Sequence, residues 1–191
     1  AMNSVNVMDD AGRIWGAGIA VTTANFVTVS NSSMTLSRAT SVAGFYIAYS
    51  SRSTISYSTA AVVDASAIAV YSIASASNIY TSSVFKNTGG PAFQFTTGSK
   101  NNTVALSTVT GNESSGFGAF HFDATSSNTV SRSYIYGTSG VALNFQPNAN
   151  ANTIMQSTVA NNAASWAAFN LQGASSNTIK DSWISNPANN A

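Results

Sequence analysis

The feature that most constrains this chain is a short motif that recurs about every 25 residues. Four late copies read Asn-Thr-Val or Asn-Thr-Ile, and three weaker copies precede them. The apolar residue that closes each copy stands at positions 27, 55, 79, 104, 130, 154 and 179, with separations of 28, 24, 25, 26, 24 and 25 residues. Self-similarity at such a period is typical of solenoid proteins, in which each repeat packs only on its neighbours.

Other residue types recur at fixed distances from this motif in each repeat. Three residues after the apolar position stands a serine, in Ser58, Ser82, Ser107, Ser133, Ser157 and Ser182. Five residues after it stands a β-branched residue, in Val84, Val109, Ile135, Val159 and Ile184. A small residue and then an apolar pair lie upstream, in Phe45/Ile47, Ile68/Val70, Phe93/Phe95, Phe120/Phe122, Leu143/Phe145 and Phe169/Leu171.

These columns predict an all-β fold of short strands joined by turns. In residues 119–123 the period-2 alternation points Phe120 and Phe122 inward and His121 and Asp123 outward. A single-stranded parallel β-helix of about seven turns places every column in register, and parallel crossovers are nearly always right-handed. We expect this solenoid over residues 18–191, as a segment of a longer protein. Residues 1–17 are expected to form an N-terminal cap or a degenerate first turn.

Two polar columns are predicted to be structural ladders inside the bends. The first is an asparagine column of Asn102, Asn128, Asn152 and Asn177. Asparagine tolerates left-handed backbone angles, and its amide can bond the equivalent residues above and below. The second is a serine column that includes Ser107, Ser133, Ser157 and Ser182, whose hydroxyls can bond backbone groups.

The spacing Asn-Thr-Val/Ile-x-x-Ser-x-Val/Ile, followed by Ala-Phe-x-Phe/Leu, resembles the right-handed parallel β-helix repeat of the pectate-lyase-like superfamily. The resemblance covers about residues 18–185. It implies the fold, but it does not imply one function, because that superfamily includes polysaccharide lyases, hydrolases, epimerases, phage tailspikes and surface proteins. The chain carries serine at the second bend, where many such repeats carry asparagine.

Composition excludes several functions. Only 7% of residues are charged and the net charge is +1, so the chain lacks the basic surface that nucleic acid or an acidic membrane would require. It has no cysteine and no run of 18 apolar residues, so thiolate metal sites, disulfides and a membrane-spanning helix are not expected. The six acids form no calcium-binding cluster in the sequence, and we predict no metal and no cofactor.

One pair of residues is a candidate for catalysis. His121 and Asp123 lie two apart on one predicted strand, so both face outward and can touch. Histidine is a general base near neutral pH, and a carboxylate would raise its pKa. The alternative interpretation, which we favour, is a solvated pair on a polar wall.

The outward-facing residues of this strand and of the equivalent strands in other repeats predict a surface that binds a sugar chain. Its outward positions are amides and hydroxyls stacked at regular spacing, with Gln94, Asn144, Gln146, Asn170 and Gln172 as candidate glycan contacts. Phe117 and Trp166 in the preceding loops, and Tyr134 and Trp183 on another strand, are candidate aromatic platforms. The alternative is that the polar columns only keep a weakly charged protein soluble.

A threonine column raises a third possibility, ice binding. It consists of Thr54, Thr103, Thr129, Thr153 and Thr178, but the neighbouring outward residues do not form the paired array that ice binding needs. The leading hypothesis is therefore a non-enzymatic, secreted or cell-surface stalk or adhesin-like segment that contacts glycans, with homo-oligomeric or end-to-end contacts through uncapped ends. The alternative is a carbohydrate-active lyase or hydrolase that uses His121 and Asp123.

Overall fold

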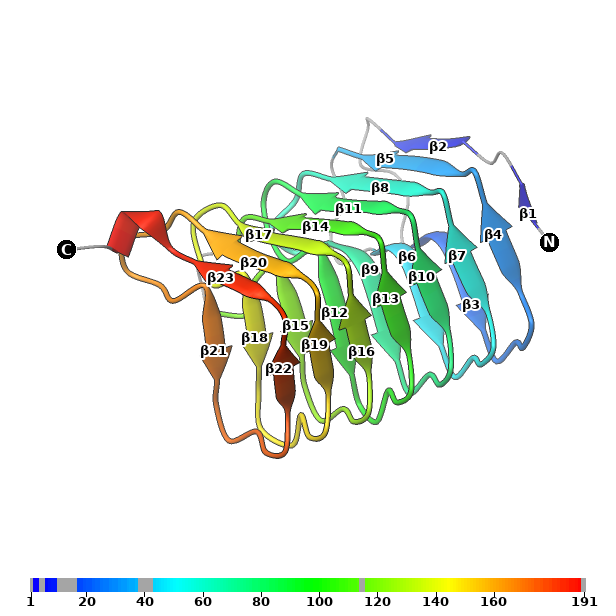
Figure 1. Ribbon diagram of the computed structural model, residues 1–191. Helices are drawn as coiled ribbons and strands as arrows, with labels where there is room; N and C mark the ends of the chain where they lie inside the picture. The colour runs from blue at the N-terminus through cyan, green and yellow to red at the C-terminus, as the bar shows by residue number, and fades with distance from the viewer. Residues whose placement is uncertain (1, 4–5, 10–16, 38–42, 114–115, 190–191) are drawn as a thin grey trace.

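The protein winds into a solenoid of three parallel β-sheets, here called sheets A, B and C (Figure 1). The computed structural model describes residues 2–3, 6–9, 17–37, 43–113 and 116–189. Within these residues the sheets contain eight, eight and seven strands, in agreement with the predicted all-β solenoid of about seven turns. Each strand pairs in parallel with the equivalent strands one coil before and one coil after it.

The strands of each sheet follow one another along the solenoid axis. Sheet A consists of β1 (Met2–Asn3), β4 (Thr28–Ser30), β7 (Thr54–Ser56), β10 (Ile79–Thr81), β13 (Thr103–Ala105), β16 (Thr129–Ser131), β19 (Thr153–Met155) and β22 (Thr178–Lys180). Sheet B consists of β2 (Asn6–Asp9), β5 (Ser33–Leu36), β8 (Thr59–Val62), β11 (Val84–Asn87), β14 (Thr108–Gly111), β17 (Tyr134–Gly137), β20 (Thr158–Asn161) and β23 (Trp183–Ser185). Sheet C consists of β3 (Ala17–Thr22), β6 (Ala43–Ala48), β9 (Ile68–Ile73), β12 (Phe93–Thr96), β15 (Phe120–Phe122), β18 (Leu143–Phe145) and β21 (Phe169–Leu171).

A 3₁₀ helix, η1 (Pro187–Asn189), follows the last strand. Within the described residues, no helix is long and apolar enough to cross a membrane.

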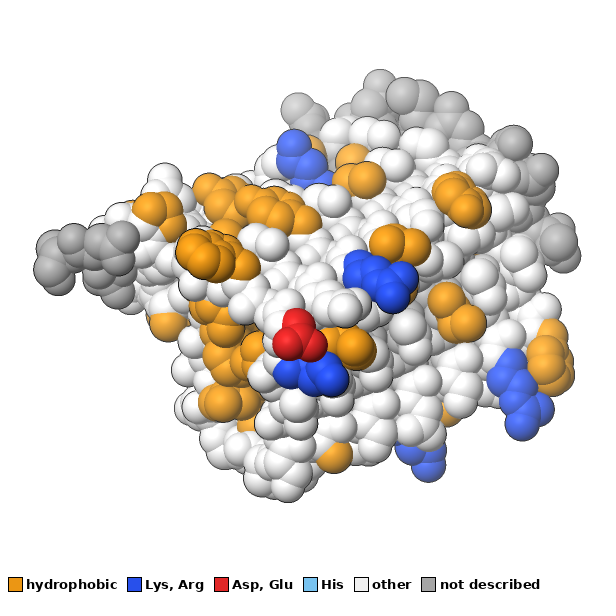
Figure 2. Space-filling view, in the orientation of Figure 1, with side chains coloured by type: hydrophobic (Ala, Val, Ile, Leu, Met, Phe, Trp, Pro, Cys, Tyr) orange, Lys and Arg blue, Asp and Glu red, His pale blue; other side chains and the backbone are white. Residues whose placement is uncertain are grey.

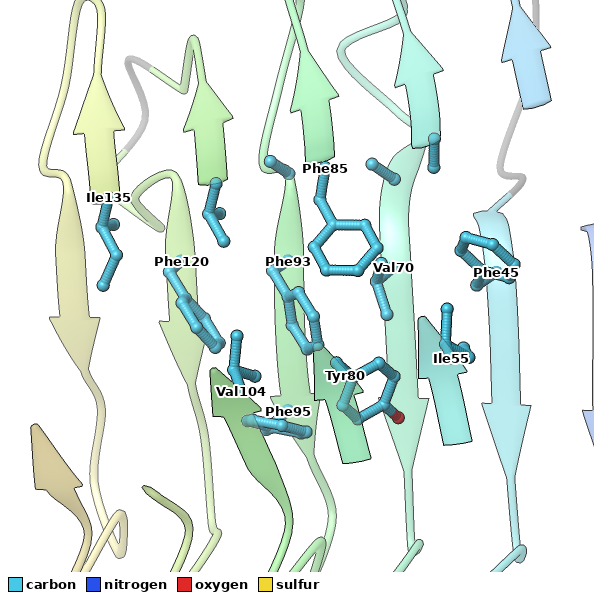
Figure 3. Packing of buried hydrophobic residues seen from close by; sticks show 14 of the residues in the cluster. Phe45, Ile55, Val70, Tyr80, Phe85, Phe93, Phe95, Val104, Phe120 and Ile135 are labelled. Carbon is cyan, nitrogen blue, oxygen red and sulfur yellow. The ribbon is translucent and has the colours of Figure 1, made fainter. Parts of the chain in front are cut away.

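The core is a continuous apolar column along the axis of the solenoid (Figure 3). Its centre is aromatic, with neighbouring ring centroids from 4.6 to 6.5 Å apart, in Phe45, Tyr80, Phe85, Phe93, Phe95, Phe120, Phe122 and Phe145. Full burial of such a side chain contributes about 1.5–3 kcal/mol. Because the same position repeats in every coil, each ring packs on rings from the coils beside it.

The predicted asparagine ladder is confirmed. The backbone N–H of Asn102 donates to Asn128 Oδ1 at 2.9 Å, and that of Asn128 donates to Asn152 Oδ1 at 3.0 Å. Asn152 continues the ladder to Asn177 at 2.8 Å. The side-chain amides also donate to backbone carbonyls of the preceding coil, as Asn128 does to Ser99 O at 3.1 Å.

The serine ladder is present as well, at the bend between sheets A and B. The N–H of Ser107 donates to Ser133 Oγ, and the N–H of Ser133 donates to Ser157 Oγ, both at 3.2 Å. A third ladder, which the sequence analysis missed, lies at the bend after sheet C. There Ser50 and Ser75 each donate a backbone N–H to the serine hydroxyl of the next coil, at 3.3 and 3.4 Å.

The bends themselves are made by residues in the left-handed backbone region. In the asparagine ladder and in the serine ladder between sheets A and B, these residues stand one position before the ladder residues, with φ between 48° and 58°, as in Asn101, Leu106, Ser127 and Arg132. The expectation that the ladder asparagines adopt left-handed angles is therefore wrong. Each left-handed residue costs about 1–2 kcal/mol, and the ladder hydrogen bonds that follow it offset this cost.

The predicted register is wrong in the earlier coils. Val29 and Tyr80, rather than residues 27 and 79, pair with Ile55 and fill the core column of sheet A. Ile79 faces outward and is 44% exposed.

The same error shifts three other columns. The structure places Ser83 and Phe85 in the columns predicted for Ser82 and Val84, and it places Asn78 in the asparagine ladder. It also places Val70 and Ser72 opposite Phe93 and Phe95, in place of the predicted pair Ile68/Val70. The physical reason for the shift of the first three columns is the hydrogen bond from the Asn78 N–H to Asn102 Oδ1, which fixes the coil one residue further along than an aliphatic pattern suggests. The apolar pair on β9 is displaced by two residues.

Described strands reach both ends of the solenoid. β1 and β2 pair with β4 and β5, so these parts of residues 1–17 continue sheets A and B. At the other end, Leu171 and Ile184 occupy core columns but are 52% and 43% exposed.

Candidate functional site

The outer face of sheet C carries a polar and aromatic column that runs along the solenoid axis. Strand pairing places its members in register, in the order Tyr46, Tyr71, Gln94, His121, Asn144 and Asn170. Each of them alternates with core residues, so their side chains point away from the core. The stacking of Gln94, His121, Asn144 and Asn170 agrees with the register predicted from the sequence.

A short loop crosses over the middle of this column. It runs through Gly116, Phe117 and Gly118 on the way from sheet B to β15, and two side chains of the column hold it. His121 Nδ1 lies 2.9 Å from Phe117 O, and Asn144 Nδ2 donates to Gly116 O at 2.7 Å. Because a carbonyl oxygen only accepts, Nδ1 carries the proton of the neutral imidazole. His121 and Asn144 therefore position the loop.

Glycine is required where this loop touches the column. Gly116 and Gly118 have φ of 96° and 89°, which disfavours residues with a Cβ. A Cβ on Gly118 would lie 3.2 Å from Asn144 Cβ, and one on Gly116 would lie 3.4 Å from the Trp166 ring. The loop thus packs closely on Asn144 and Trp166.

The Phe117 side chain separates two hollows on this face. Its ring is 51% exposed and its centroid lies 5.1 Å from that of the His121 ring. On one side is a hollow of about 280 Å³, lined by Phe117, Trp166, Gln146, Asn170 and Gln172. On the other is a hollow of about 300 Å³, lined by residues that include Ser66, Pro91, Gln94, Glu113 and Phe117. Both combine an aromatic ring with side chains that form hydrogen bonds.

His121 does not lie on the surface as the sequence analysis expected. It faces away from the core but is only 1% exposed, since the Phe117 loop covers it. Burial lowers its pKa, and the hydrogen bond to Phe117 O, Asp123 and Glu113 oppose this effect. Among the described residues, no hydrogen bond joins His121 to Asp123. Asp123 Oδ2 instead accepts from Thr96 Oγ1 at 3.3 Å.

The burial of His121 predicts a pH-dependent stability. The folded state favours the neutral imidazole, so its stabilising contribution is complete above the ordinary histidine pKa of 6.5 and is lost as the pH falls through the lower folded pKa. We expect the free energy of unfolding to fall more steeply in the wild type than in His121→Asn between about pH 7 and about pH 5. Urea denaturation at a series of pH values measures both slopes, and equal slopes would contradict the assigned environment of His121.

The other predicted contact residues divide between two faces of the solenoid. Gln94, Gln146, Asn170 and Gln172 line the two hollows, whereas Asn144 is fully buried and accepts from Asn170 Nδ2 at 3.0 Å. Tyr134 and Trp183 lie on β17 and β23 of sheet B, away from sheet C.

Two aromatic side chains are exposed on sheet B, with Thr158 between them in the same column. Tyr134 is 42% exposed and its ring stacks on that of Tyr136, with the ring centroids 6.0 Å apart. Trp183 lies two coils further toward the C-terminus and is 69% exposed. Figure 2 shows apolar side chains gathered at the C-terminal end of the molecule, with scattered basic side chains elsewhere on this face. Tyr134 and Trp183 remain candidate contact residues that are separate from the sheet C surface.

Two aromatic members of the sheet C column were not predicted from the sequence. Tyr46 and Tyr71 are half-buried, with ring centroids 5.8 Å apart, one coil beyond Gln94 and further toward the N-terminus. Burial raises the pKa of Tyr71, and nearby Tyr46 and Asp123 add to this effect. The signal was available, because both tyrosines alternate with core residues. The incorrect register of β9 affected Tyr71 alone, because Tyr46 lies between the correctly predicted core residues Phe45 and Ile47.

The ionisable groups of this face are few. In the part of the chain that the structure describes, no group of three or more His, Cys, Asp or Glu residues could hold a metal ion. Glu113 and Asp123 lie close enough to His121 to raise its pKa, and Glu113 lines one hollow. The face can form many hydrogen bonds with a neutral polar ligand.

The geometry defines a parallel β-helix with an elongated polar and aromatic surface on one sheet. The chain belongs to the right-handed β-helix family, whose model matches residues 6–124, and this agrees with the predicted handedness. A solved structure, the A-module of the mannuronan C-5 epimerase AlgE4 of Azotobacter vinelandii, is similar over 85% of this chain and 63% of that module, at 13% identity and a TM-score of 0.41. The chain thus spans less than two thirds of that module. No curated protein matches the sequence.

Proposed function

We propose that this chain is a non-enzymatic β-helical module, secreted or displayed at a cell surface, that binds a glycan along the outer face of sheet C. The observation that carries the proposal is the Phe117 ring, half-exposed between two hollows that are lined by amide side chains. A concave surface lined by aromatic rings with a few convergent polar groups is typical of ligand sites.

The chemistry of the two hollows suits a sugar chain. Amide side chains both donate and accept hydrogen bonds, as sugar hydroxyls do. Gln94, Asn170 and Gln172 present such groups along the wall, and successive strands lie about 4.8 Å apart. Aromatic and amide groups combined in a hollow are typical of sites that bind neutral polar ligands. A glycan lying along the axis would contact both hollows.

The state of His121 favours binding over catalysis. A general base must reach the proton that it removes, yet the one described histidine is covered and its Nδ1 holds the Phe117 loop. Asp123 is hydrogen-bonded to Thr96 and does not orient the imidazole. His121 thus acts in this proposal as a positioning residue for Phe117.

A carbohydrate-active enzyme, a lyase or a hydrolase, is the alternative function. The observation in its favour is that Glu113 and Asp123 both act electrostatically on His121 beside a hollow. Movement of the Phe117 loop would be required to bring His121 into contact with a substrate. Glycan turnover distinguishes the two functions.

Aromatic truncation tests the proposed surface. Phe117→Ala and Trp166→Ala each remove a ring that lines the 280 Å³ hollow, and we expect each to weaken glycan binding about tenfold or more. The matched control is Trp183→Ala, which removes an exposed ring from sheet B. Affinity electrophoresis in gels containing soluble polysaccharides measures the three variants and the wild type.

Two outcomes of this experiment would contradict the proposal. One is unchanged binding in Phe117→Ala and Trp166→Ala. The other is a loss confined to Trp183→Ala, which would move the site to the Tyr134 and Trp183 surface of sheet B.

A further inference from the structure

The N-terminal part of the sheet C face carries a pair of tyrosines. Tyr46 on β6 and Tyr71 on β9 are in register, and their ring centroids lie 5.8 Å apart with an angle of 37° between the ring planes. Both side chains are half-buried, so part of each remains accessible on the outer face. Aromatic residues that face each other across neighbouring strands hold each other in place. The pair is therefore an ordered aromatic surface.

This tyrosine pair is continuous with the hollows around Phe117. Strand pairing places Gln94 directly beside Tyr71, in the next coil toward the C-terminus. Gln94 lines the 300 Å³ hollow, and so does Ile68, which lies on the same strand as Tyr71. The tyrosine pair therefore borders this hollow on its N-terminal side.

The tyrosines lengthen the candidate surface along the axis. From Gln94 to Asn170 the sheet C column crosses three steps between coils of about 4.8 Å each, a length of about 14 Å. From Tyr46 to Asn170 it crosses five such steps, a length of about 24 Å. A ligand that contacts the tyrosines as well as both hollows must therefore be an elongated chain.

We infer that Tyr46 and Tyr71 form a third contact region for the glycan, so that the sheet C surface takes an internal stretch of a long linear polysaccharide. This inference rests on the proposed function. A tyrosine offers an apolar ring to the C–H groups of a sugar and a hydroxyl that both donates and accepts hydrogen bonds. Rings that are already ordered lose little conformational entropy when a ligand binds. Short sugars fill the hollows alone, whereas long chains also gain the tyrosine contacts.

The inference predicts that affinity increases with chain length. Cello-, manno- and xylo-oligosaccharides from trimers to hexamers are measured by isothermal titration calorimetry. A trimer can occupy the hollows, whereas a hexamer also reaches the tyrosines. We expect the hexamer of the preferred sugar to bind the wild type about tenfold or more tightly than its trimer.

Tyrosine variants test the cause of this length dependence. In Tyr46→Ala combined with Tyr71→Ala, we expect hexamer affinity to fall about tenfold or more and trimer affinity to stay within about twofold of the wild type. Tyr57→Ala is the matched control, because Tyr57 is 68% exposed at the bend between sheets A and B. Circular dichroism verifies the fold. Threonine at both positions, which favours strands, repeats the test if the alanine variant unfolds.

The outcomes separate this inference from the proposed function. A wild type that binds trimers and hexamers equally well would overturn the third contact region and leave glycan binding in the hollows in place. A tyrosine variant that binds hexamers like Tyr57→Ala, or that loses trimers and hexamers equally, would also overturn it. A folded wild type that binds no member of the series would overturn the proposed function and the inference together.

Discussion

Val130→Asp is expected to abolish cooperative folding of the rod or to lower its melting temperature by about 10 °C or more. Val130 lies on β16, is fully buried, and pairs with Val104 and Ile154 of the adjoining coils. An aspartate there would place a carboxylate among apolar side chains, with no cation to pair with it. Burying an unpaired charge costs several kcal/mol, about 4 kcal/mol or more for the whole substitution.

The neighbouring position provides the control for this prediction. Thr129 lies on the same strand but faces outward, so Thr129→Asp keeps its carboxylate in contact with water. We expect its melting temperature to stay within a few degrees of the wild type, as measured by circular dichroism. Equal melting of Val130→Asp and the wild type would contradict the inward assignment of the sheet A column.

Asn128→Ala is expected to destabilise the protein by about 3 kcal/mol or more. Its Oδ1 accepts from the Asn102 N–H at 2.9 Å and from Asn102 Nδ2 at 3.0 Å. Its Nδ2 donates to Ser99 O at 3.1 Å and to Asn152 Oδ1 at 3.0 Å. Alanine would leave the buried Asn102 N–H without a partner, at a cost of about 1–3 kcal/mol, and would remove three further hydrogen bonds, each worth about 0.5–1.5 kcal/mol.

Thr129→Ala is the matched comparison for the ladder residue. The Thr129 side chain is half-buried on the outer face and has no role in the ladder, so we expect a change of about 0.5 kcal/mol or less. Urea denaturation gives both free energies of unfolding. A larger loss for Thr129→Ala than for Asn128→Ala would show that the ladder does not stabilise the bend as described.

The later coils could be predicted from the sequence because their pattern is chemically unambiguous. From Asn102 onward, one asparagine, one β-branched residue and one serine recur at fixed offsets, and the structure keeps all three columns. Each ladder asparagine accepts from a backbone N–H of the preceding coil and donates to a backbone carbonyl, so its spacing fixes the register. The outward column of Gln94, His121, Asn144 and Asn170 followed from the same alternation.

The coil that contains β10 and β11 was less predictable because aromatic residues occupy its core. A pattern based on β-branched residues favours Ile79 and Val84 as core positions, yet Tyr80 and Phe85 are the buried residues. Burial raises the pKa of the Tyr80 hydroxyl far above its usual value, and this hydroxyl has no hydrogen-bond partner of good geometry. Buried tyrosine hydroxyls usually have a hydrogen-bond partner, so a sequence pattern does not favour tyrosine at this core position.

The site depended on a loop that periodicity does not describe. Alternation placed His121 outward, but only the backbone path through Gly116, Phe117 and Gly118 explains why it is buried. The glycines in this segment are the signal that could have indicated a tight loop over the sheet. The repeat pattern of the sequence predicts which face of a sheet a residue occupies. The exposure of that residue depends on the loops that cross the face.

The central claim is that the sheet C surface binds glycans without converting them. The most direct measurement incubates the purified protein with a broad panel of polysaccharides and records both retention and new reducing or unsaturated chain ends. The account predicts retention that Phe117→Ala weakens, with no new chain ends. Release of product that His121→Ala abolishes would contradict it and would establish a carbohydrate-active enzyme.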